Sequence, residues 1–427
     1  MKRLLIIQAA ALGANLFRGD RQLPFGLKLR TTQPVFPAVT CTAQASFRTA
    51  STPARHGMVA NGLYFHRLSK PMFWEQSSRL VEGERIWEDF RRRGRTVGMM
   101  FWQQSLGEDV DLLLSPAPIH KHHGGMIQDC YTKPAGLYDI LCDRIGKKFN
   151  LMRYWGPLAS AKVGDWIASA TAAVLEDAKL APHLLLTYLP SMDYDLQRHG
   201  PDHPKTRKAL DITLSQIERL AETADECGYE VLLWGDYTIV GCDGPVLPNL
   251  SLREAELMSA RDVKGMLYPD FHQSRGFAVV DHEVAHVYIP DAGDVDPARE
   301  VLSGLDGVAE VLGPEQLTEA GLDHPNAGQL VLVAEEGSWF AYPWWTEKSQ
   351  QPDFATHVDI HNKPGFDPAE LFFGWPPGGI ARDLSKIRGS HGRAGEGRDV
   401  VWASTIDLGS PEDVIGLAGA VKKWLDE

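Results

Sequence analysis

Short apolar runs alternate with long helical patterns along this 427-residue chain, and this alternation constrains the fold more than any other feature. Such runs are typical of strands that are buried on both faces, as in a parallel sheet. They cover residues 4–7, 96–102, 109–114, 183–189 and 230–234. The longest helical pattern, 205–227, lies between the last two runs. We therefore predict an α/β domain with a central, mostly parallel sheet flanked by helices.

Residues 275–345 follow a different pattern. Stretches 276–289 and 329–341 are typical of strands, and 296–312 of a helix between them. We expect a small α+β insertion here, on a core formed by residues 1–274 and 346–427. The Gly- and Arg-rich piece 388–398 predicts a loop.

The charge balance limits the classes of partner that the chain is expected to bind. Asp and Glu number 56 and Lys and Arg 43, which gives a net charge of −13. An acidic balance disfavours nucleic acid or an anionic membrane as partner, and no apolar run approaches the roughly 20 residues of a membrane-spanning helix. A phosphate-handling site would then need its own positive charge, from a metal ion or a few arginines.

The N-terminus allows two interpretations. A basic start, an apolar run and small residues imitate a secretory signal peptide, but residues 4–7 also suit a buried first strand. The five cysteines are odd in number and none has CxxC spacing, which is typical of a reduced intracellular chain. We therefore favour the strand and expect a cytoplasmic protein.

Polar residues follow the predicted strands. Asp193 comes after run 183–189, Asp236 directly after run 230–234, and Thr40 precedes a predicted helix. Ligands of open α/β sheets bind beyond the carboxyl ends of the strands, so two carboxylates and a hydroxyl are expected at one sheet edge. Thr40 is either a nucleophile, activated by the helix N-terminus or a metal, or only a helix cap. Thr42 and Ser46 are expected to be cap and helix residues.

The segment 37–64 resembles the nucleophile region of the nucleotide pyrophosphatase/phosphodiesterase branch of the alkaline phosphatase superfamily. Counted from Thr40, a proline thirteen residues on, His-Gly at sixteen and seventeen, and an asparagine at twenty-one match as Pro53, His56, Gly57 and Asn61. The resemblance implies that Thr40 is the nucleophile and that Asn61 donates a hydrogen bond to a phosphoryl oxygen.

The metal-ligand motifs of that family are only partly present. Asp193 matches, but Gln197 stands where a histidine is expected, and Tyr237 follows Asp236 where the family has Asp-His. The carboxylate expected after the first strand falls near Ala10.

A last ligand histidine is expected beyond the insertion, and His361 is the best candidate. The resemblance then implies metal ligands at Thr40, Asp193, Asp236 and His361, with Gln197 and Tyr237 as weak ones. A neutral amide is a weak zinc ligand, so we expect one divalent ion, Zn²⁺, Mn²⁺ or Mg²⁺, rather than two zinc ions.

Other histidines are pocket candidates. His120, His122 and His123 form a tract that either contacts metal or phosphate or is a solvated loop. His282 and His286 lie in the predicted strand 276–289, where about 3.3 Å per residue puts them roughly 13 Å apart, so they cannot share one metal. One of them lines the pocket or both are structural.

Positive charge for a phosphate is expected from Arg48, Arg275 or Lys363, each of which is otherwise an ordinary surface residue. The aromatic residues of 339–345 and 372–375 form either a pocket wall or a packed core.

The resemblance implies a metal-dependent phosphohydrolase that cleaves a small-molecule phosphate monoester, diester or pyrophosphate through Thr40. One alternative is a catalytically silent member that binds a phosphorylated small molecule, because ligands are replaced at Ala10, Gln197 and Tyr237. Another is a phosphoryl or sulfuryl transferase on the same fold. The oligomeric state is left open.

Overall fold

A computed structural model of the chain describes residues 2–19, 21–122, 125–375 and 378–427. Within them, the main sheet has the strand order β2-β22-β11-β1-β10-β5-β6-β9. Its parallel centre consists of β11 (Glu230–Gly235), β1 (Leu4–Ala9), β10 (Leu184–Leu189), β5 (Val97–Met100) and β6 (Leu112–Pro116). Each of the five apolar runs named in the sequence analysis forms one of these strands, so the predicted α/β architecture is confirmed.

Antiparallel strands close both edges of this sheet. One edge carries β22 (Val400–Ser404) and β2 (Arg30–Thr32), and the other carries β9 (Cys130–Lys133). The first strand, β1, lies in the middle and is buried along its whole length. This position explains its near-continuous run of Leu and Ile, because both faces of the strand are covered by helices.

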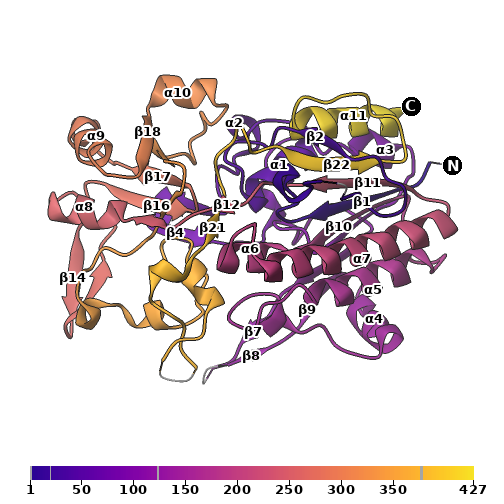
Figure 1. Cartoon of the computed structure of the whole chain (residues 1–427), viewed down its shortest axis with the longest axis horizontal. Coiled ribbons are helices and arrows are strands. Elements are labelled where there is room, and N and C mark those ends of the chain that lie inside the picture. Colours follow the sequence, from indigo (N-terminus) through magenta and orange to yellow (C-terminus); the bar gives the residue numbers. More distant parts are fainter. Residues whose placement is uncertain (1, 20, 123–124, 376–377) are drawn as a thin grey trace.

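Helices cover the two faces of the main sheet (Figure 1). One face carries α4 (Leu137–Ile145), α5 (Val163–Leu175) and α7 (Pro204–Glu226); the other carries α1 (Thr40–Thr49), α3 (Glu88–Arg92) and α11 (Val414–Asp426). Helix α7 begins after His203, whose side chain accepts a hydrogen bond from the Lys205 N–H, and it buries Leu210, Ile217 and Leu220 at the predicted spacing.

A second lobe lies beside the main sheet. Its four-stranded antiparallel sheet has the order β16-β17-β19-β18, with α8 (Pro248–Glu254) and α9 (Val295–Ser303) against it. The strands are β16 (Phe277–Asp281), β17 (Val284–Tyr288), β19 (Leu330–Ala334) and β18 (Val308–Leu312). Helix α10 (Pro314–Glu319) follows β18.

Three predicted elements of this lobe differ in the structure. The predicted strand 329–341 divides into β19 and β20 (Ser338–Phe340), with Gly337 at a φ of +83° between them. The predicted strand 276–289 is a hairpin, because His282 adopts a φ of +62°, which ends the extended run. The predicted helix 296–312 ends at Ser303, and its last residues form edge strand β18 instead. Gly307, with a φ of +88°, makes the turn between them.

The hydrophobic core of the second lobe draws on more of the chain than 275–345. It includes side chains from β3 (Gly62–Phe65), β4 (Lys70–Phe73) and α8, and from the stretch 340–366. Hairpin β14–β15 (Ala260–Val263 and Met266–Pro269) extends from it.

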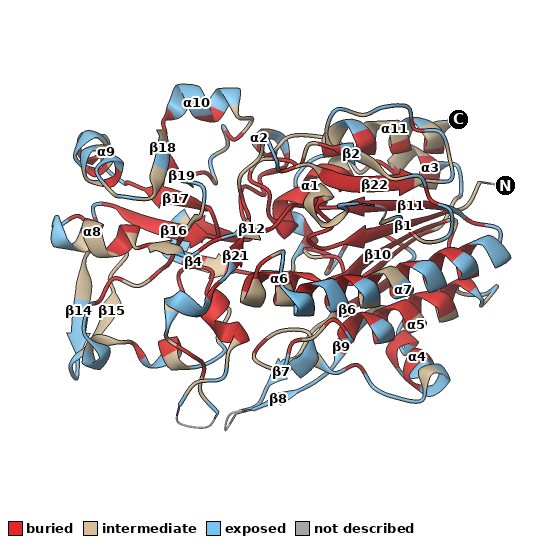
Figure 2. Ribbon diagram, viewed as in Figure 1, coloured by how far each residue is buried: buried red, intermediate tan, exposed pale blue. Residues whose placement is uncertain are grey.

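Buried residues fill both lobes and the region between them, where α6 (Asp193–His199), β12 (Val240–Gly241) and β21 (Gly389–Ser390) lie (Figure 2). Among the described residues, no helix combines the length and apolarity needed to cross a membrane.

Candidate functional site

The Thr40 hydroxyl lies at the N-terminus of α1, next to the carboxyl edge of the main sheet. Val39 is the N-cap residue, and no side chain caps the helix there, so Thr40 is the first helical residue rather than its cap. Thr40 Oγ1 is 3.3 Å from the Tyr237 hydroxyl, which donates to Asp193 Oδ1 at 3.1 Å. A tyrosine hydroxyl has one proton, so Thr40 is the donor in the first bond. These three side chains form one hydrogen-bonded chain.

Neutral donors occupy both carboxylates of the site. Gln197, one turn after Asp193 on α6, donates from Nε2 to Asp193 Oδ2 at 2.7 Å. Asp236 follows β11 and accepts from Gln8 Nε2 at 2.8 Å and from the Ala11 N–H at 2.9 Å.

Burial raises the pKa of Asp193 to about 6 and that of Asp236 to about 7. Their hydrogen bonds oppose this rise but are outweighed. Within the described residues, neither carboxylate forms a salt bridge with a lysine, arginine or histidine. An ionised carboxylate buried without a counter-charge is unfavourable, so the pair is balanced either by protons or by a bound cation.

His391, which the sequence analysis did not identify, contacts the site directly. Its ring stacks on Tyr237 with centroids 3.6 Å apart and 1° between planes, and its Nδ1 hydrogen-bonds the Ala38 carbonyl oxygen at 2.7 Å. His391 follows β21, inside the stretch predicted to be a loop. The one signal for it was a histidine before a glycine in a Gly-rich run.

The predicted histidines separate into two places. His282 lies beside His391, with ring centroids 3.8 Å apart, and its Nδ1 is 2.8 Å from Asp281 Oδ1. His361 is exposed and instead contacts the Phe73 carbonyl oxygen and the ring of His120.

The histidine tract itself lies in an exposed part of the chain. His120 belongs to the exposed hairpin of β7 (Ile119–His120) and β8 (Met126–Ile127). His122 is exposed as well, and His123 lies outside the described residues.

Asn61 connects the start of α1 to the second lobe. Its Oδ1 accepts from the Cys41 N–H at 2.9 Å, and its Nδ2 donates to Asp281 Oδ1 at 3.0 Å. The structure therefore places Asn61 beside the residue that follows Thr40.

Two further motif residues have visible structural roles. His56, on α2 (Pro53–His56), bonds Ser46 of α1 through Nε2 at 2.8 Å. Gly57 has a φ of +76°, which few other residues adopt.

The expected sources of positive charge are used elsewhere. Arg48 is fully buried and donates to the Gln104 carbonyl and to Glu108. Lys363 is buried between two carboxylates, and Arg275 pairs with Asp294. Residues 339–342 and Trp344 are buried in packed cores, whereas Phe373 and Trp375 are exposed.

An oxygen-rich set suits one hard cation better than two zinc ions. No group of three or more His, Cys, Asp or Glu side chains is arranged as a metal site in the part of the chain that the structure describes. The two carboxylates and Thr40 Oγ1 supply oxygen, and the buried Oε1 of Gln197 has no hydrogen-bond partner. Such ligands are those of Mg²⁺ or Mn²⁺. Ala10 supplies no carboxylate at the position where the resemblance predicted one.

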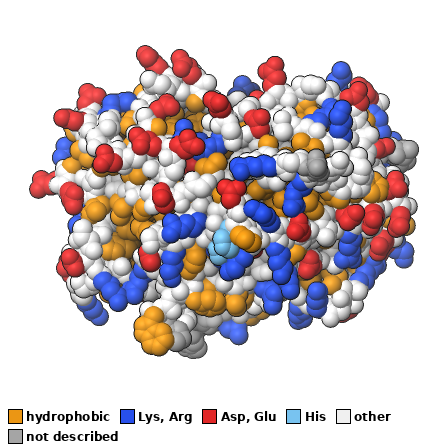
Figure 3. All heavy atoms as spheres, viewed as in Figure 1, with side chains coloured by type: hydrophobic (Ala, Val, Ile, Leu, Met, Phe, Trp, Pro, Cys, Tyr) orange, Lys and Arg blue, Asp and Glu red, His pale blue; other side chains and the backbone are white. Residues whose placement is uncertain are grey.

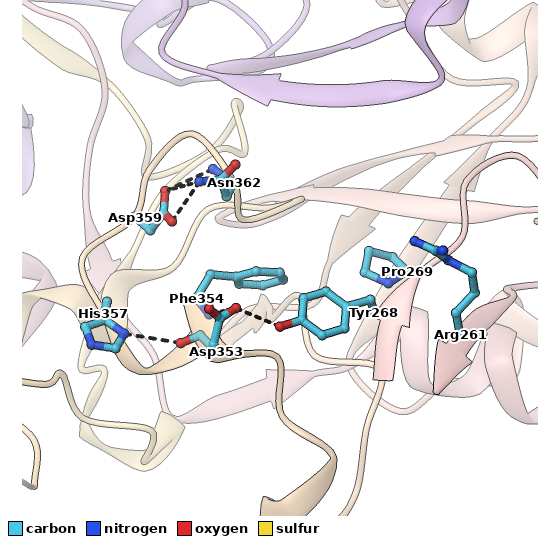
Figure 4. A pocket seen from close by; sticks show the side chains of 8 residues that line it. All are labelled: Arg261, Tyr268, Pro269, Asp353, Phe354, His357, Asp359 and Asn362. Atoms are coloured by element: carbon cyan, nitrogen blue, oxygen red, sulfur yellow. Dashed lines mark hydrogen bonds between the residues drawn. The ribbon is translucent and has the colours of Figure 1, made fainter. Parts of the chain in front are cut away.

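An open pocket of about 460 Å³ lies elsewhere, in the second lobe between hairpin β14–β15 and residues 353–362 (Figure 4). Asp353 lies between Tyr268, whose hydroxyl donates to its Oδ1 at 2.8 Å, and His357. The complete lining is Arg261, Tyr268, Pro269, Asp353, Phe354, His357, Asp359 and Asn362. None of these belongs to the Thr40 group.

Comparison with solved structures gives matches over the whole length. Phosphonoacetate hydrolase from Sinorhizobium meliloti 1021, in complex with phosphonoformate, shares 15% identity over 98% of this chain and 95% of its own, with a TM-score of 0.62. Human ectonucleotide pyrophosphatase/phosphodiesterase 5 shares 14% identity over 100% of this chain and 95% of its own, with a TM-score of 0.60. The murine protein, at 14% identity, covers the same shares with a TM-score of 0.58. These likenesses show a common fold.

A search of curated proteins gives no match. The sequence profile of the type I phosphodiesterase / nucleotide pyrophosphatase family matches residues 25–367, which is most of the chain. The chain therefore belongs to the type I phosphodiesterase / nucleotide pyrophosphatase family of phosphoric ester hydrolases, within the alkaline phosphatase superfamily.

Proposed function

We propose that the chain hydrolyses a small-molecule phosphoric ester through a covalent intermediate on Thr40, with one divalent cation at the two carboxylates. The observation that carries this proposal is the hydrogen-bonded chain from Thr40 through Tyr237 to Asp193. It supplies the activating base that a threonine hydroxyl needs at neutral pH.

The proton path follows from the donors and acceptors. Thr40 Oγ1 attacks phosphorus; its proton passes to the Tyr237 oxygen while the Tyr237 proton passes to Asp193 Oδ1. The bond from phosphorus to the leaving oxygen breaks, and that oxygen takes a proton from a water molecule, which leaves hydroxide. The hydroxide attacks phosphorus and displaces Thr40 Oγ1, which regains its proton from Tyr237 as Tyr237 takes back the proton from Asp193. Asp193 must be ionised at the start, and the pKa of about 6 allows this at neutral pH.

Two features would bind the phosphoryl oxygens. The N-terminus of α1 favours an anion at Thr40, through the helix dipole and backbone N–H groups. Asn61 Nδ2 carries a second N–H besides the one donated to Asp281.

The cation would be held by Asp193, Asp236 and Thr40, with Gln197 Oε1 as a weaker ligand. When bound, it would lower the pKa of the threonine hydroxyl and offset the phosphoryl charge.

The substrate class comes from the relatives. The family name specifies phosphodiesters and pyrophosphates, and an inactive variant of the murine relative is described in complex with AMP. We therefore propose a small phosphodiester or pyrophosphate. The second candidate, a silent protein that binds such an ester, is favoured by one observation: neutral amide and hydroxyl donors already occupy both carboxylates.

The test is turnover of p-nitrophenyl phosphate and of its bis-ester with Mg²⁺, Mn²⁺ or Zn²⁺, for wild type, Thr40→Ala and Thr42→Val. Thr42 is a matched control, since it is buried on the same helix and its hydroxyl has no partner. We expect Thr40→Ala to lose at least about a thousandfold in kcat and Thr42→Val to keep it. Retained turnover in Thr40→Ala would remove the nucleophile. Ester binding without turnover in wild type would establish the silent protein.

A further inference from the structure

Exposed apolar side chains gather on one part of the molecule. Among the described residues, thirteen large apolar side chains are exposed. Nine of these come from three stretches: four from 119–131, two from 152–158 and three from 358–375. The most exposed is Trp375, at 79%, followed in these stretches by Phe373, at 62%. Single exposed apolar residues are ordinary, but a concentration of this kind marks an interaction surface.

These stretches are neighbours in space. The Leu151 N–H donates to Gln128 Oε1 at 2.9 Å, which joins the first stretch to the second. Arg198 bridges the second and third, because it donates to the carbonyl oxygens of Ala159 and Leu371. His120 lies beside His361, with ring centroids 6.5 Å apart.

One part of this region, 119–162, is basic, although the chain is acidic; the other part, 358–375, has Lys363 against Asp359, Asp367 and Glu370. Residues 119–162 contain seven Lys and Arg against three Asp, in a chain of net charge −13. Six of the seven form no ion pair among the described residues: Lys121, Lys133, Lys147, Lys148, Arg153 and Lys162. Figure 3 shows Lys, Arg and apolar side chains together along the lower part of this face.

We propose that this basic-apolar surface, formed by 119–122, 125–162 and 358–375, docks on an anionic phospholipid bilayer. Tryptophan and phenylalanine side chains insert at the headgroup level of a membrane, and unpaired lysines and arginines attract anionic lipids. The acidic remainder of the molecule would keep the other faces away from the lipid and so fix the orientation. The overall charge predicted no such partner, but the local charge favours it. This inference does not rest on the proposed reaction.

The test is cosedimentation of the full chain with vesicles of phosphatidylcholine, with and without phosphatidylserine. We expect binding to the phosphatidylserine vesicles that weakens as salt is raised. Phe373→Ser/Trp375→Ser and Lys121→Glu/Arg153→Glu should each reduce it by about tenfold or more. Phe25→Ser/Leu68→Ser and Lys28→Glu/Lys423→Glu are matched controls, exposed elsewhere, and should bind as wild type. Thermal melts of all variants check that they fold.

Three outcomes would overturn the proposal. One is no binding of the wild-type chain to either vesicle. The second is equal binding of all four double variants to the phosphatidylserine vesicles. The third is a dimer in size-exclusion chromatography that Phe373→Ser/Trp375→Ser dissociates, which would show that a second copy covers this surface.

Discussion

Two buried acidic clusters of this chain differ in how their negative charge is balanced. In the second lobe, Lys363 Nζ lies 2.7 Å from both Asp367 Oδ2 and Glu370 Oε1, and all three side chains are buried. At the carboxyl edge of the main sheet, Asp193 and Asp236 are buried as well, but their hydrogen-bond donors are neutral amide, hydroxyl and N–H groups.

The difference separates a structural cluster from a functional one. Where the chain supplies its own cation, the charge is balanced at folding and nothing further is needed. Burial raises the pKa of Glu370 too, but the ion pair with Lys363 opposes that rise. Asp193 and Asp236 have no ion pair among the described residues, so this site can exchange protons or bind a cation. The second arrangement lies next to Thr40, where the proposed reaction needs both a proton acceptor and a bound cation.

The largest effect is expected from Lys363→Met, which removes the cation of the structural cluster. It leaves Asp367 and Glu370 buried without a counter-charge, so we expect a loss of about 3–5 kcal/mol in the free energy of unfolding. Lys422→Met is the control, because its pair with Glu84 is partly exposed and its loss should stay within about 1 kcal/mol. Urea unfolding measures both. Equal losses in the two variants would contradict the assignment of a balanced cluster.

Asp236→Asn should remove a pH dependence of the free energy of unfolding that arises from the functional cluster. The folded-state pKa of about 7 exceeds the ordinary value of 3.8, so the protonated form stabilises the fold. That contribution is complete below pH 4 and is lost as the pH rises to 7. An asparagine at position 236 does not titrate, so the variant does not lose stability in this way. Its amide group can donate a hydrogen bond to Gln8 Oε1, which has no partner among the described residues.

In chelator, the stability of Asp236→Asn relative to wild type should therefore increase between pH 4 and pH 7, by at most about 4 kcal/mol. Urea unfolding at several pH values measures the difference. Parallel stability curves for the two proteins would show that Asp236 is ionised and already compensated.

Tyr237→Phe tests the proton path of the functional cluster. The substitution keeps the ring that stacks on His391 but removes the hydroxyl between Thr40 and Asp193. We expect kcat to fall about a hundredfold, or about 2.7 kcal/mol, with a small change in stability. Tyr194→Phe is the control, since the Tyr194 hydroxyl is buried without a partner. Turnover of the bis-ester that is equal in all three proteins would remove Tyr237 from the reaction.

The main sheet could be predicted because its central strands are buried on both faces, which produces continuous apolar runs. The antiparallel edges β2 and β9 give no such pattern, whereas β22 has the buried apolar run Val400–Ala403, which the sequence analysis did not identify as a strand. In the second lobe, the turn at His282 depends on a positive φ, which the presence of a histidine does not predict. The hairpin β16–β17 was therefore predicted as one strand.

The candidate site was predictable to a similar extent. Thr40, Asp193 and Asp236 follow from strand ends, which parallel strands bring to one edge. His391 reaches Tyr237 through the pairing of β12 with β21, two strands of two residues each, and no periodicity reveals pairs that short. His361, which the family resemblance favoured as a ligand, contacts Phe73 and His120 instead.

The central claim is that the functional cluster, which has no lysine or arginine paired with it among the described residues, binds a divalent cation. Equilibrium dialysis against Mn²⁺, followed by elemental mass spectrometry, tests this most directly. We expect about one ion per chain in wild type and in His361→Ala, and none in Asp193→Asn or Asp236→Asn. No bound ion in the wild-type chain, or an ion that both Asn variants retain, would contradict a cation site at these carboxylates.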